Sequence, residues 1–67
     1  MQIILNGKPR ALPEGASVAQ LLESLGLAGE MVAVERNLEI VPRAERALAL
    51  LKEGDQVEVL RFMGGGR

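Results

Sequence analysis

The spacing of the apolar residues changes twice along this chain, and this change restricts the folds that it can adopt. Residues 1–6 alternate so that every second side chain shares a face, as in a half-buried strand. Residues 16–27 instead repeat their apolar side chains at the spacing of one helix face, at Val18, Leu21, Leu22 and Leu25. Alternation returns in residues 31–37 and 56–62. One helix among several strands predicts an α+β domain, in which a mixed sheet of four or five strands packs on that helix.

Turn-forming residues indicate where these elements begin and end. The Asn-Gly pair at positions 6–7 is a strong hairpin signal because both residues tolerate positive φ. Residues 8–13 are then the returning strand, and their two prolines suggest an edge position. Ser17 is predicted to cap the helix in a capping box with Gln20, and Gly26 is predicted to end it.

The pattern is less regular after the third strand. Asn37 fits a turn into a short fourth strand over residues 38–41, which Pro42 ends. Residues 42–50 contain helix formers behind a proline, and we expect one or two irregular or 3₁₀-like turns there. Residues 52–55 form a surface turn before the last strand. The first and last strands are the most apolar, so we expect them to be neighbours in the middle of the sheet.

The chain carries few groups that could perform catalysis. It has no histidine, cysteine, threonine or tyrosine, and its hydroxyls are Ser17 and Ser24. We therefore expect no intrinsic enzymatic activity and no metal site, and assign Ser17 to helix capping rather than to nucleophilic attack.

A net charge of -1 and a single aromatic residue argue against nucleic-acid binding. No apolar stretch approaches the about 20 residues of a membrane span. The N-terminus lacks the apolar block of a secretion signal, so we expect a cytoplasmic location.

The last strand presents apolar side chains on both faces. The valines at 57 and 59 share one face, and the opposite face carries Gln56, Glu58, Leu60 and Phe62. The two polar residues should face water, so Leu60 and Phe62 are predicted to be exposed as well. The alternative is a bulge or a bend at the strand end that turns one of them inward. If exposed, they form with Met63 an apolar patch on which a partner protein could dock.

Three glycines follow this strand: Gly64, Gly65 and Gly66. Because glycine loses the most backbone freedom on ordering and buries no side chain, we predict a globular domain over residues 1–62 and a flexible tail over residues 63–67. A backbone without Cβ atoms fits a narrow channel in another enzyme. Such an enzyme could use ATP to convert the unreactive terminal carboxylate to an acyl adenylate, which a sulfur donor would convert to a thiocarboxylate.

These segments together resemble a known family. The turn "LNG", the helix "ASVAQLLESLGL", the segment "VAVERN…IVPR", the strand "EGDQVEVLRF" and the "GGG" end are similar to the sulfur carrier proteins of thiamin biosynthesis, the ThiS family. The resemblance covers essentially the whole chain. Its glycine end is shared with other ubiquitin-like proteins, whereas "VAVERN…IVPR" favours the thiamin type.

The resemblance implies a ubiquitin-like β-grasp fold and a non-catalytic protein cosubstrate that itself binds no cofactor. It implies that Gly66 is adenylated with ATP by a ubiquitin-activating-type adenylyltransferase, and that sulfur from a cysteine desulfurase makes the thiocarboxylate. Thiazole synthase would then take this sulfur into the thiazole ring of thiamin. The residues that would dock on these enzymes are Leu60, Phe62 and Met63.

Arg67 departs from the family, whose chains ordinarily end on glycine. If it is retained, the reactive carboxylate belongs to arginine, whose bulk a glycine channel should reject. Trimming by a peptidase would expose Gly66, and Arg67 could also be foreign to the natural chain. Three alternatives stay open: a sulfur carrier for tRNA thiolation or molybdopterin synthesis, a non-covalent β-grasp interaction module, and covalent tagging of a partner lysine.

Overall fold

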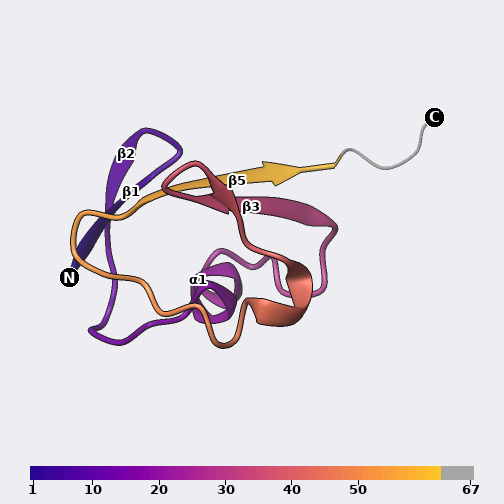
Figure 1. Cartoon of the computed structure of the whole chain (residues 1–67), viewed down its shortest axis with the longest axis horizontal. Helices are drawn as coiled ribbons and strands as arrows, with labels where there is room; N and C mark the ends of the chain where they lie inside the picture. Colours follow the sequence, from indigo (N-terminus) through magenta and orange to yellow (C-terminus); the bar gives the residue numbers. More distant parts are fainter. Residues whose placement is uncertain (63–67) are drawn as a thin grey trace.

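The computed structural model describes residues 1–62, which form a five-stranded sheet with a helix on one face (Figure 1). The elements in chain order are β1 (Gln2–Leu5), β2 (Lys8–Ala11), α1 (Val18–Ser24), β3 (Val32–Arg36), β4 (Glu39–Ile40), a 3₁₀ turn (Arg43–Glu45) and β5 (Gln56–Arg61). The strand order is β2-β1-β5-β3-β4, with β1 parallel to β5 and the other neighbours antiparallel. This mixed sheet on one helix confirms the predicted β-grasp architecture.

β5 is the central strand of the sheet. On one side β1 pairs with its first half, through Ile4 with Gln56 and Leu5 with Val57. On the other side β3 pairs with it from Val57 to Arg61, which is all of β5 except its first residue. The prediction that the first and last strands are neighbours in the middle is therefore confirmed. In Figure 1 β5 crosses the sheet and ends at the side of the molecule opposite the N-terminus.

The β1–β2 hairpin forms as the sequence predicts. Asn6 and Gly7 both have positive φ, 49° and 84°, as in the tight turns that match the twist of a hairpin. β2 is an edge strand, which explains why Pro9 is tolerated in it: a missing backbone N–H costs nothing on the open side.

α1 begins at the predicted capping box. The Ser17 hydroxyl accepts a hydrogen bond from the Gln20 backbone N–H at 3.1 Å, and the Gln20 side chain accepts one from the Ser17 N–H at 2.9 Å. Both bonds satisfy amides that have no partner within the helix. Gly26, with φ of 73°, lies just after the helix as predicted.

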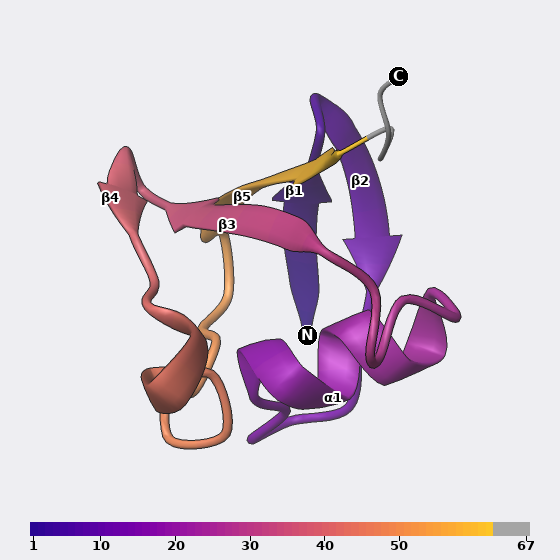
Figure 2. The same ribbon diagram turned by 90° about the vertical axis from the view of Figure 1, so that its right-hand side faces the viewer.

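The core lies between α1 and the inner face of the sheet, and Figure 2 shows α1 below the strands. Its buried apolar residues are Ile3, Leu12, Ala16, Val18, Leu21, Leu22, Val32, Val34, Val41, Leu51, Val57 and Val59. These residues come from the apolar stripe of the helix and from alternate positions of the strands, because the stripe and the inward-facing strand positions pack against each other. The outer face of the sheet has no helix over it in the part of the chain that is described.

The region between β3 and β5 contains the predicted short strand and 3₁₀ turn, but the strand is shorter than the sequence predicts. β4 is only two residues long, and a 3₁₀ turn follows Pro42. The β3–β4 turn places Asn37 at φ 51° as expected, but it also places Leu38 at φ 72°. A leucine rarely adopts this conformation, and nothing in its local sequence indicated it. The turn must be this tight because β3 and β4 pair immediately on either side of it.

Replacing Ser17 with alanine is expected to lower the free energy of unfolding by about 1 kcal/mol, because one amide of the first helical turn loses its partner. In a domain of this size that corresponds to a fall in Tm of about 4–8 °C. Urea and thermal denaturation measure both. Ser24→Ala is the control, since Ser24 bonds a carbonyl within the helix rather than an N-terminal amide. An equal or larger loss in the control would contradict the capping role.

Candidate functional site

The end of β5 carries two exposed apolar side chains. Val57 and Val59 are buried in the core, whereas Leu60 and Phe62 are each 56% exposed. The predicted exposure is confirmed, and neither side chain is turned inward. The physical reason is that the Phe62 N–H donates a hydrogen bond to the Met31 carbonyl at 3.1 Å. This bond continues the β3–β5 ladder past the strand end and prevents a bend there.

β3 completes an apolar surface around these two residues. Ala33 lies directly opposite Leu60 in the sheet register, and Met31, which is 67% exposed, lies opposite Phe62. We call these four residues the exit patch: Met31, Ala33, Leu60 and Phe62. Sequence reasoning found Leu60 and Phe62 but missed Met31 and Ala33, because only the pairing of β3 with β5 brings them together.

Acidic side chains border the exit patch. Glu35 and Glu58 lie directly opposite each other on the same face, two steps along the ladder from the pair of Ala33 and Leu60. Like charges in this position repel each other, so the pair is locally unfavourable. Arg61 does not neutralise it, because its guanidinium is 3.3 Å from the Glu30 carboxylate in an exposed ion pair, which contributes little to stability. The patch is thus apolar at its centre and negative along one border.

Two asparagines hold β5 from opposite sides. The Asn6 side chain accepts a hydrogen bond from the Val59 N–H at 2.8 Å and donates one to the Val59 carbonyl at 3.4 Å. The Asn37 side chain accepts one from the Gln56 N–H at 2.9 Å, and its backbone N–H donates to the Gln56 carbonyl at 2.7 Å. The sequence predicts both asparagines only as turn residues. Their bonds to β5 depend on strand register and were missed.

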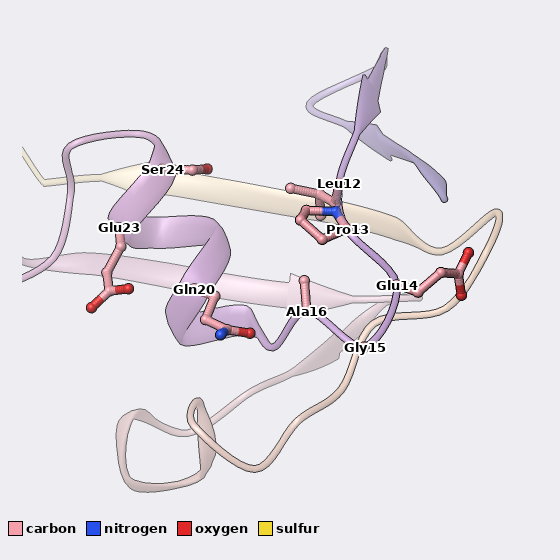
Figure 3. Close-up of a pocket in the computed structure, with 8 residues that line it drawn as sticks. All are labelled: Leu12, Pro13, Glu14, Gly15, Ala16, Gln20, Glu23 and Ser24. Carbon is pink, nitrogen blue, oxygen red and sulfur yellow. The ribbon is translucent and has the colours of Figure 1, made fainter.

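The acidic residues of residues 1–62 form no cluster of potential metal ligands, and the recess beside α1 does not bring its carboxylates together. No group of three or more potential metal ligands occurs among residues 1–62. A recess of about 500 Å³ lies between α1 and the loop that precedes it (Figure 3). Its carboxylates, Glu14 and Glu23, point away from each other, and the Ser24 hydroxyl already donates a hydrogen bond to the Leu21 carbonyl. None of the helices described between residues 1 and 62 has the length and hydropathy that a membrane span requires.

Comparison with known proteins gives concordant results. The family model described as the ThiS family matches residues 3–66. The chain belongs to the ThiS family. The sulfur carrier protein ThiS of Thermus thermophilus is 42% identical to this family member over 92% of this chain and 95% of the relative. The crystal structure of the thiamine biosynthesis protein ThiS from Geobacter metallireducens superposes with a TM-score of 0.83, at 42% identity over 98% of this chain and 100% of that one.

A second kind of relative is much longer. The thiazole synthase of Magnetococcus marinus is 46% identical over 100% of this ThiS-family chain, which spans only 21% of that protein. A domain of this type is therefore also found within larger proteins that carry the thiazole synthase name.

Several predicted site residues of this ThiS-family member lie outside the described residues: Met63, Gly64, Gly65, Gly66 and Arg67. The boundary between a globular domain and a tail, the docking role of Met63 and the reactive role of Gly66 therefore remain predictions. The described part of the site is the exit patch, which includes two of the last residues before them, Leu60 and Phe62.

Proposed function

We propose that this ThiS-family protein is a sulfur carrier in thiamin biosynthesis, a protein cosubstrate that supplies sulfur from its own carboxyl end. The observation that carries this proposal is the exit patch. It places exposed apolar side chains on the last residues of the central strand, directly before the glycine run, in a chain of this family. An apolar patch at that position gives a partner enzyme a surface to bind while the following glycines enter its active site.

The proposed chemistry has two steps, both at the Gly66 carboxylate. In the first step a carboxylate oxygen attacks the α-phosphorus of ATP, the bond to pyrophosphate breaks, and an acyl adenylate forms. In the second step hydrosulfide attacks the carbonyl carbon, a C–S bond forms, and the C–O bond to AMP breaks. The products are a thiocarboxylate, AMP and a proton. The carrier supplies only the carboxylate, and ATP is bound by the partner that activates it.

Three partners follow from this chemistry. An adenylyltransferase of the ubiquitin-activating type performs the first step, a cysteine desulfurase is the source of sulfur, and thiazole synthase is the acceptor. The last assignment is supported by the longer relatives, in which a segment similar to this entire chain is part of a protein named thiazole synthase. Leu60, Phe62 and Met63 are proposed to contact these enzymes.

The test is intact-mass analysis of the chain ending at Gly66 after incubation with ATP, the adenylyltransferase and sodium hydrosulfide. The expected result is a mass increase equal to the exchange of one oxygen for one sulfur, dependent on ATP. Addition of thiazole synthase and its small-molecule substrates should then return the original mass and yield a thiazole.

Three outcomes would contradict the proposal. Conjugates of higher mass would indicate transfer to a partner lysine. Binding without any mass change would indicate a non-covalent module. Sulfur loading followed by transfer to tRNA or to a molybdopterin precursor, but not to the thiazole, would confirm the carrier chemistry and refute the pathway.

A further inference from the structure

The Asn6 side chain acts as a substitute for a missing residue of β1. β1 bonds to β5 through Ile4, whose N–H donates to the Asp55 carbonyl, and the Asn6 backbone N–H continues this series to the Val57 carbonyl at 2.9 Å. At Asn6 the chain turns back into the hairpin with φ of 49°, so no further main-chain group of β1 can reach β5. The Asn6 carboxamide takes the next place and bonds both polar backbone groups of Val59.

Val59 is the last residue of β5 for which the described part of the chain provides hydrogen bonds on the β1 side. The register of β1 with β5 ends at Val57, and the Asn6 carboxamide extends it by one step. Beyond Val59 the chain is held on the β3 side alone, through the pairing of Arg61 with Val32 and the bond from the Phe62 N–H. The Asn6 bridge, defined as these two bonds to Val59, is therefore the final two-sided anchor before the exit patch ends.

We propose that Asn6 is a positioning residue for sulfur loading, a role that rests on the proposed carrier function. The glycines after Met63 have no side chains through which their direction could be set, so that direction depends on how firmly the preceding strand is held. An enzyme that binds the exit patch receives the terminus in its active site more often when the preceding strand leaves the domain at a fixed angle. Loss of the Asn6 bridge frees one edge of the strand and reduces the fraction of bound carriers in the reactive geometry.

Asn37 provides a matched control within the same chain. It also lies in a hairpin turn at positive φ, with a value of 51°, and its carboxamide also accepts a hydrogen bond from a β5 backbone N–H. Its partner is Gln56, at the beginning of β5 rather than near the end. If both asparagines only stabilise the fold, their substitutions should change sulfur loading to a similar extent. If Asn6 positions the strand, only its substitution should lower the rate of loading.

The experiment compares Asn6→Gly with Asn37→Gly, since glycine tolerates the positive φ of both turns and removes only the carboxamide. Both variants are expected to lose similar thermal stability. Only Asn6→Gly is expected to speed hydrogen exchange at the Val59 amide and to lower kcat for thiocarboxylate formation, by about tenfold, with little change in KM for the carrier. Asn6→Asp keeps the acceptor for the Val59 N–H and is expected to restore most of the rate.

Equal kcat values for Asn6→Gly and Asn37→Gly, measured on chains ending at Gly66 and with the unsubstituted chain loading normally, would overturn the role of Asn6 and leave the carrier function intact. If Asn6→Gly does not fold, a tenfold or larger loss of kcat in Asn6→Asp with unchanged hydrogen exchange at the Val59 amide would refute the role, because the retained bond would then not support loading. Failure of the unsubstituted chain ending at Gly66 to gain sulfur would instead refute the proposed function.

Discussion

Deleting residues 64–67 is expected to abolish sulfur loading completely while leaving the folded domain unchanged. The deletion removes the glycines and places the terminal carboxylate next to the exit patch, from where it cannot extend into a partner's active site. No core residue is removed, because the core ends at Val59. Intact-mass analysis after incubation with ATP, the adenylyltransferase and hydrosulfide measures loading, and thermal denaturation measures folding.

A second comparison is between the chain that ends at Gly66 and the chain that retains Arg67. Its reactive carboxylate would belong to arginine, whose side chain a channel shaped for glycine should exclude. We therefore expect the chain ending at Gly66 to load fully and the chain ending at Arg67 to load poorly. Normal loading of the Arg67 form would contradict the steric argument. Loading of the form without residues 64–67 would refute the reactive role of Gly66.

Replacing Phe62 with aspartate is expected to weaken binding to the adenylyltransferase with almost no change in Tm. A buried aromatic side chain at the centre of an interface typically contributes about 2 kcal/mol or more, which corresponds to a roughly 30-fold rise in KM for the carrier. The charge also adds to the negative border formed by Glu35 and Glu58. Tm should hold because Phe62 is 56% exposed and lies outside the core.

Leu48→Asp is the matched control for this substitution. Leu48 is 82% exposed and follows the 3₁₀ turn instead of lying in the exit patch. We expect it to change neither KM nor Tm. A large loss of Tm in Phe62→Asp would show that Phe62 supports the fold, and equal KM values for the two variants would refute docking through the exit patch.

Local sequence patterns were sufficient for much of the fold. The alternation in residues 1–6 and the helix spacing in residues 16–27 fixed which side chains face the core, because side-chain direction follows directly from backbone geometry. The capping box of Ser17 with Gln20 spans three residues and forms as expected. The same alternation placed Leu60 and Phe62 on the exposed face.

Features that join distant parts of the chain could not be predicted in this way. The bond of Asn6 to Val59 spans 53 residues, and the contact of Met31 with Phe62 depends on how β3 and β5 align. The opposition of Glu35 to Glu58 has the same origin. A single sequence indicates that such residues are polar or apolar, but it does not indicate which strand lies beside which, or in what register.

The sequence by itself determined the elements of this ThiS-family chain, their inward faces and the glycine run at positions 64–66, since each depends on neighbouring residues only. The tertiary structure alone decided that Met31 and Ala33 complete the exit patch and that Asn6 anchors the strand leading to it. The physical reason is that register is selected by packing of the whole core, where burying apolar side chains on α1 and on all the central strands at once permits one alignment.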